Sequence, residues 1–145
     1  MKDKVNRIEA VSLEVILPLR TEVLRDGQPP ESAQFDGDHA STTLHLAAYH
    51  HDDQVIGCVS LMHRPMPADP TRTHQLRGMA VAEPWRSRGV GALLLTQLQQ
   101  RTSEFCVWCN ARVPAQRFYE RHGWRAVSER FDIPHHGPHV RMVRA

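Results

Sequence analysis

Two glycines and two arginines near the middle of the chain have the spacing of an anion-binding loop. Residues 76–98, LRGMAVAEPWRSRGVGALLLTQL, read as an apolar strand, a short basic loop and a helix that begins near Gly89 and Gly91. Glycine lets the backbone adopt positive φ and approach a ligand closely. The first N–H groups of a helix lack partners within the helix and carry a partial positive charge. With Arg86 and Arg88 alongside, this RxxGxG pattern predicts a pyrophosphate site, and an ordinary strand-to-helix turn is the alternative.

The pattern differs from two other phosphate-binding motifs. A P-loop needs GxxxxGK followed by Ser or Thr, and a dinucleotide fingerprint needs a third glycine and a downstream acidic residue. The loop has neither the lysine nor the third glycine. A nucleotide-phosphate binder is therefore disfavoured.

Length and composition bound the class of protein. The 145 residues predict a single domain over residues 1–145. With 41% hydrophobic residues, 23% charged residues and a formal net charge of +2, the chain is expected to be soluble, with no nucleic-acid or membrane partner. The N-terminal MKDKVNRIEA lacks the apolar core of a signal peptide, and three cysteines fit a reducing compartment. We expect a cytoplasmic location.

The elements that must position the loop alternate between strands and helices. A helix over 12–24 contains Pro18, which predicts a kink or a late start. Residues 25–41 read as a loop with a helical turn near 31–35, and its acids either attract a cationic substrate or are simply solvated. Gly78 suggests a bulge in its strand. We expect strands over 5–10, 42–49, 55–62, 74–81, 105–109, 124–131 and 140–143, and helices after Ser12, Gly89 and Pro114.

Two motifs together resemble a known family. RSRGVG (86–91) opens the central helix, and AQRFYERHGW (115–124) is similar to the AxxxYexxGF segment of the GNAT superfamily of acyl-CoA N-acyltransferases. The resemblance covers nearly everything from residue 44 onward. LRxxVLRxGQ (19–28), FDGD (35–38) and GPHVRM (137–142) also resemble the small ElaA-like branch.

The resemblance implies the fold and the cofactor contacts. The implied fold is α/β (α+β), with a mixed, mainly antiparallel central sheet of six to seven strands, flanked by helices and splayed at the cofactor site. The loop backbone would hold the pyrophosphate of coenzyme A, and the preceding strand would pair with its pantetheine arm and polarise the thioester. The implied residues are Met79, Ala80 and Val81 in the strand and Arg86, Ser87, Arg88, Gly89, Val90 and Gly91 in the loop.

The resemblance also implies a general acid. Tyr119 matches the position that protonates the expelled thiolate of coenzyme A in many relatives, which would also place it against the cofactor. The alternative is a tyrosine that merely packs with its hydroxyl in water.

The general base is less defined. An amine acceptor must lose a proton before or during its attack, to a carboxylate, a histidine or a water chain. Glu83 follows the cofactor strand, and His139 begins the last strand, where relatives build the acceptor pocket. His45 and His74 are further candidates, and each of these residues taken alone is more often structural than catalytic.

The chain departs from the family pattern beside the second motif. Many relatives have an asparagine in contact with the cofactor where this chain has Arg112. Asn110, two residues earlier, either takes over that contact or only finishes the strand. Trp124 replaces the usual phenylalanine, which is a mild change.

No metal is expected. Cys106 and Cys109 form a single CxxC pair with no second pair, and the strand-like residues between them favour a buried strand over zinc or redox chemistry. His135 and His136 lie in a proline-containing loop, and relatives need no metal.

The resemblance, together with these residues, implies an N-acetyltransferase that moves an acetyl group from acetyl-CoA to the primary amine of a small molecule or peptide by direct attack. A catalytically silent CoA-binding sensor or interaction module is the alternative. The acceptor and the acyl preference stay open, as does a homodimer.

Overall fold

The computed structural model describes residues 5, 7–51 and 53–144. The chain divides into two compact units, one of residues 1–62 and 78–102 and the other of residues 63–77 and 103–145. Strand β4 (His74–Val81) belongs to both, because the boundary falls between Arg77 and Gly78. The two units therefore share one continuous strand.

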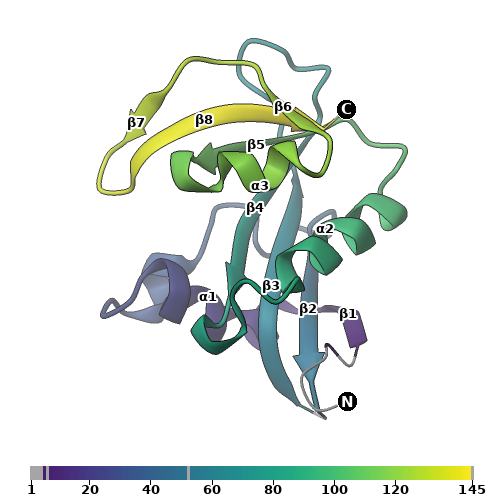
Figure 1. Ribbon diagram of the computed structural model, residues 1–145, viewed down its shortest axis with the longest axis vertical. Coiled ribbons are helices and arrows are strands. Elements are labelled where there is room, and N and C mark those ends of the chain that lie inside the picture. Colours follow the sequence, from purple (N-terminus) through teal and green to yellow (C-terminus); the bar gives the residue numbers. More distant parts are fainter. Residues whose placement is uncertain (1–4, 6, 52, 145) are drawn as a thin grey trace. The chain divides into compact units, whose positions relative to one another are not determined.

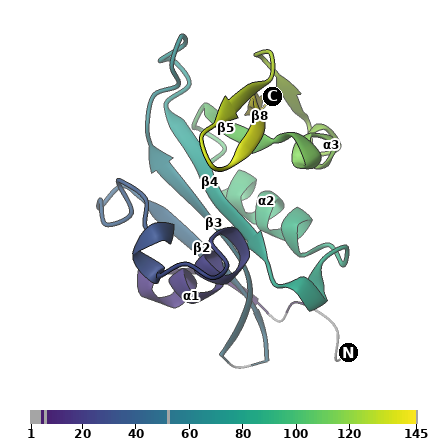
Figure 2. The same cartoon turned by 90° about the vertical axis from the view of Figure 1, so that its left-hand side faces the viewer.

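The first unit is a sheet with a helix on each face. Strands β1 (Arg7–Val11), β2 (Leu44–His50) and β3 (Gln54–His63) form antiparallel pairs in that order, and β3 neighbours β4. Helices α1 (Leu13–Leu24) and α2 (Val90–Arg101) lie on opposite faces of β2 and β3, as Figures 1 and 2 show. Two 3-10 turns complete the unit, η1 (Pro30–Ala33) and η2 (Glu83–Trp85).

Alternation along β3 explains why helices cover both faces. Cys58 packs in the core cluster that α1 forms with Ala47 of β2. Its neighbour Gly57 points to the other face, because successive strand residues alternate. A Cβ on Gly57 would lie 2.7 Å from Val90 Cγ1, so the missing side chain lets α2 approach the sheet closely.

The second unit is built around the long final strand. Strand β8 (Gly137–Arg144) pairs antiparallel with β5 (Val107–Arg112), β6 (Trp124–Ala126) and β7 (Phe131–Ile133). Residues His74–Leu76 of β4 pair in parallel with Val107–Cys109 of β5. A 3-10 turn η3 (Val113–Ala115) leads from β5 into the short helix α3 (Gln116–Glu120), whose C-cap residue is Arg121. The splay of β4 from β5 beyond these pairs stays a prediction.

The fold class is confirmed, and several element boundaries are corrected. The sheet is mixed and mainly antiparallel, and it has eight strands over the described residues instead of six to seven. The expected strand 105–109 is β5, which runs to Arg112 and leaves out Phe105. The expected strand 124–131 is two strands, β6 and β7, and the last one begins at Gly137. Helix α1 starts at Leu13, so the late start considered for Pro18 is wrong.

Candidate functional site

The RxxGxG loop has the backbone of an anion cradle. Gly89 is the N-cap residue of α2 with φ of 85°, and Ser87 has φ of 63°. Left-handed residues occur in the turns whose successive N–H groups form anion-binding concavities. Among the described residues, the first turn of α2 carries no acidic side chain, and Gly89 has no side chain to cap the helix. An external anion would therefore meet the N–H groups of α2 without an internal competitor.

Both arginines of this loop contact residues that precede it in the chain. Arg86 donates from Nε to the carbonyl oxygen of Val81, 3.2 Å away, and so joins the end of β4 to the loop. The guanidinium of Arg88 lies 5.5 Å from the ring centroid of Trp85, which is buried. Both charged groups are exposed, so they add positive potential beside the open helix end.

Strand β4, which leads into this loop, contains one residue with irregular backbone, Gly78. Gly78 has φ of 66°, the conformation of the first residue in a glycine bulge, which agrees with the irregularity expected from the sequence. A Cβ there would lie 3.0 Å from Arg20 Nε. Of the following residues predicted to bind the cofactor, Ala80 is buried in the core, while Met79 and Val81 are half-buried. Glu83 follows in η2 with an exposed side chain.

In the second unit, Tyr119 of α3 is in an environment suited to a proton donor. Its side chain is buried, with its ring centroid 5.3 Å from those of Phe118 and Trp124. Burial, and to a lesser degree the neighbouring Cys109, raises the pKa of the phenol well above 10. The hydroxyl is therefore protonated at neutral pH.

His139 is buried on β8, and one of its ring nitrogens is already hydrogen-bonded. Its Nδ1 lies 2.8 Å from the carbonyl oxygen of Gly137, and because a carbonyl only accepts, Nδ1 carries the hydrogen. In the neutral ring, Nε2 then holds the lone pair, which is the form a general base needs.

Asn110 lies in the middle of β5, so the idea that it only finishes the strand is wrong. Its Oδ1 is buried and has no hydrogen-bond partner among the described residues. Asn110 is paired directly with Arg141 of β8, and His139 with Arg112. An unsatisfied buried acceptor is costly, so this oxygen is suited to receive a ligand N–H.

The other histidine candidates have structural partners. His45 Nε2 lies 2.9 Å from the carbonyl oxygen of Asp38, and its Nδ1 lies 2.6 Å from Ser60 Oγ. Both ring nitrogens are thus occupied, which leaves no lone pair for a substrate. The ring of His74 stacks on Phe105 with centroids 3.8 Å apart, and burial lowers its pKa.

A buried ionic network in the first unit was not found by sequence reasoning. Arg20, which is fully buried, donates from Nη1 to Asp38 Oδ2 at 2.8 Å and from Nη2 to Ser60 Oγ at 2.8 Å. Asp38 is therefore a structural partner, so it does not attract a cationic substrate as considered for the acidic loop. The segments LRxxVLRxGQ and FDGD contain the two charged residues, yet nothing in their spacing says that they pair.

We expect Asp38→Asn to lower the free energy of unfolding by about 3–5 kcal/mol, because it leaves the Arg20 guanidinium buried without its counter-charge. Urea unfolding followed by circular dichroism measures the change. Asp26→Asn, at an exposed position on the same connection, is the control and should stay within about 0.5 kcal/mol. Equal stability of the two variants would contradict the assignment.

The described residues contain no group of three or more His, Cys, Asp or Glu side chains arranged to hold a metal ion. Cys106 is exposed and Cys109 is buried, and neither forms a disulfide. No helix in the described part of the chain is both long and apolar enough to cross a bilayer.

The fold matches those of solved crystal structures over nearly the whole chain. The crystal structure of Escherichia coli ElaA matches with a TM-score of 0.78 and 20% identity, over 96% of this chain and 99% of that one. A crystal structure of aminoglycoside 6'-N-acetyltransferase complexed with coenzyme A matches with a TM-score of 0.69 and 14% identity, over 95% and 96%. These likenesses show the fold.

Sequence comparison then gives the family. The model of the acetyltransferase (GNAT) domain matches residues 42–126. The uncharacterized N-acetyltransferase YitI of Bacillus subtilis (strain 168) is 30% identical over 141 residues, which is 94% of each chain. This chain belongs to the GNAT acetyltransferase family, so the resemblance seen in its two motifs is confirmed and acyl transfer is its general chemistry.

Proposed function

We propose that this protein transfers an acetyl group from acetyl-CoA to a primary amine by direct attack. The observation that carries the proposal is the open N-terminus of α2, where Gly89 has positive φ and a Cβ would meet nothing within 4 Å. The backbone N–H groups of residues 87–91 would bind a pyrophosphate there, and residues 79–81 of β4 would pair with the pantetheine arm. A structural neighbour complexed with coenzyme A supports this donor.

In the proposed reaction the amine nitrogen attacks the thioester carbonyl, the C–N bond forms and the C–S bond breaks. A backbone N–H of β4 would stabilise the negative charge that develops on the carbonyl oxygen. Tyr119 would give its phenolic proton to the departing thiolate, and the amine proton would leave through His139 Nε2 or a water chain. Asn110 would contact the cofactor. Glu83 is the alternative base, reached through solvent because its side chain is exposed.

The proposal is tested by calorimetric titration of acetyl-CoA and then by thiol release over a panel of amines. We expect saturable binding and amine-dependent release of coenzyme A. Cys106 is exposed and would react with a thiol reagent, so the assay uses a Cys106→Ser background. Cys58 is buried, which raises its pKa to about 12 and keeps it unreactive.

Three outcomes are distinguishable. Binding with turnover supports the proposal. Binding without turnover on any amine contradicts catalysis and favours the silent CoA-binding module. Absence of binding overturns the assignment of the loop.

A further inference from the structure

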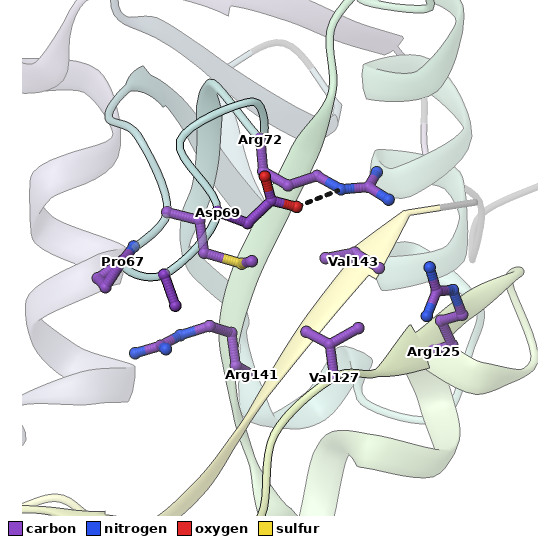
Figure 3. Close-up of a pocket in the computed structure, with 9 residues that line it drawn as sticks. Pro67, Asp69, Arg72, Arg125, Val127, Arg141 and Val143 are labelled. Carbon is purple, nitrogen blue, oxygen red and sulfur yellow. Dashed lines mark ion pairs between the residues drawn. The ribbon is translucent and has the colours of Figure 1, made fainter.

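A small cavity in the second unit has three arginines on its wall. It has a volume of about 240 Å³ and lies between the connection from β3 to β4, the region of β6, and β8 (Figure 3). Arg72 comes from the connection, Arg125 from β6 and Arg141 from β8, and Asp69 is the one carboxylate among the lining residues. The wall therefore has two positive charges in excess. None of these residues belongs to the RxxGxG loop.

Two of the three arginines, Arg72 and Arg141, are held in place before any ligand arrives. Arg72 donates from Nη1 to the carbonyl oxygen of Arg144 at 3.3 Å, and its Nε lies 4.0 Å from Asp69 Oδ2. The guanidinium of Arg141 lies 5.8 Å from the ring centroid of Trp108 and 5.4 Å from that of Phe131. Such fixed guanidinium groups lose little conformational entropy when they bind an anion.

The cavity leaves hydrogen-bonding capacity unused. Arg141 Nε is buried and has no hydrogen-bond partner among the described residues, and neither Arg125 nor Arg141 has a described carboxylate within 4.0 Å. The adjacent buried cluster is apolar, made of Met66, Trp108 and Val143. An apolar surrounding strengthens a charge-assisted hydrogen bond, and a guanidinium fork fits the oxygens of a carboxylate or phosphate.

The cavity is close to the candidate base along one strand. His139, Arg141 and Val143 alternate along β8 and so share one face, on which Asn110 lies opposite Arg141. Two residues of strand span about 7 Å, so a ligand anchored at Arg141 reaches His139 with a chain of only a few atoms. The unpaired Asn110 Oδ1 lies beside that path.

We propose that this cavity binds the oxyanion of the acceptor, and that the acceptor is a small amine that also carries a carboxylate or phosphate group. The inference rests on the proposed acetyl transfer, since it assigns the class of acceptor. The anion contacts Arg141, while Arg72 and Arg125 lie on the other side of the cavity and add positive potential (Figure 3). The amine is directed along β8 toward His139.

Direct binding tests the cavity without turnover. Inorganic phosphate and acetate are titrated separately into the protein and followed by NMR chemical shifts. We expect Arg141→Gln to weaken binding by about tenfold to a hundredfold, because it removes a charge-assisted contact. Arg125→Gln should weaken it by only about twofold to fivefold, because it removes positive potential and no direct contact. Arg125 is exposed, so its variant does not disturb the core. Arg130→Gln, an exposed arginine of the same unit, is the matched control and should bind as the wild type does.

Matched acceptors test the substrate class. β-Alanine is compared with its amide, and 2-aminoethyl phosphate with ethanolamine. We expect kcat/KM to favour the anionic member by about tenfold or more, and the preference to fall toward one in Arg141→Gln. Preference for β-alanine identifies a carboxylate acceptor, and preference for 2-aminoethyl phosphate identifies a phosphate acceptor.

The failures of the two proposals differ. If kcat/KM is the same for neutral and anionic amines and neither probe ion binds at the arginines, the inference is overturned. The proposed acetyl transfer then still stands. If no amine is acetylated, the proposed function and the acceptor assignment both fail, even where phosphate binds.

Discussion

Gly89→Trp is expected to weaken acetyl-CoA binding by at least about a hundredfold while α2 stays folded. Gly89 is the N-cap residue of α2, and the space where its Cβ would lie is open. An indole placed there would occupy the concavity in which the pyrophosphate meets the helix N–H groups. Losing two charge-assisted hydrogen bonds, each worth about 1.5–3 kcal/mol, accounts for the effect. Calorimetric titration of acetyl-CoA measures it.

Gly27→Trp separates blockage from backbone strain. Gly27 also has positive φ, 78°, and its Cβ would likewise meet nothing within 4 Å. Both variants place a tryptophan in the left-handed region, which costs about 1–2 kcal/mol, so their losses of stability should be similar. Only the variant at Gly89 should lose affinity. Unchanged binding by both would refute the pyrophosphate loop.

Tyr119→Phe is expected to lower kcat by about 10²–10⁴-fold and to leave acetyl-CoA affinity little changed. The substitution keeps the ring that packs between Phe118 and Trp124 and removes only the proposed proton donor. Steady-state thiol release gives kcat, and calorimetry gives the affinity.

The pH profile gives an independent check. Burial first, and Cys109 second, raise the pKa of Tyr119 well above 10, so the phenol stays protonated throughout the neutral range. An acid that must be protonated loses activity only as the pH rises through its own pKa, so Tyr119 should cause no fall in kcat below pH 10. Tyr49→Phe, at a buried tyrosine of the first unit, is the control and should keep the wild-type kcat. Full activity in Tyr119→Phe would exclude it as the general acid.

Local patterns predicted most of the fold and failed where polar residues continue a strand. The apolar runs of β2, β3 and β4 were found, since residues buried on both faces leave few polar interruptions. The apolar run FCVWC predicted a strand that ends at Cys109. In the structure, backbone pairing with β8 extends β5 through the polar residues Asn110 and Arg112. Phe105 was included for its apolar character, yet its ring stacks on His74 outside the strand.

The sequence by itself determined the loop of the candidate site and the family. The left-handed turn at Gly89 and the N-terminus of α2 depend on adjacent residues, because φ and helix initiation are local properties. Tyr119 was predicted as the general acid in the same way, since its motif is contiguous, and its role stays a prediction.

Tertiary structure alone decided the contacts between distant segments. Arg20, Asp38 and Ser60 come from three separate segments and meet only because the core is closed around them. Asn110 faces Arg141 because of the β5–β8 register, and a shift of one residue would place Arg141 on the opposite face. The three arginines of the cavity likewise come from three segments. Spacing along the chain carries no signal for such groups, because strand register and packing bring them together.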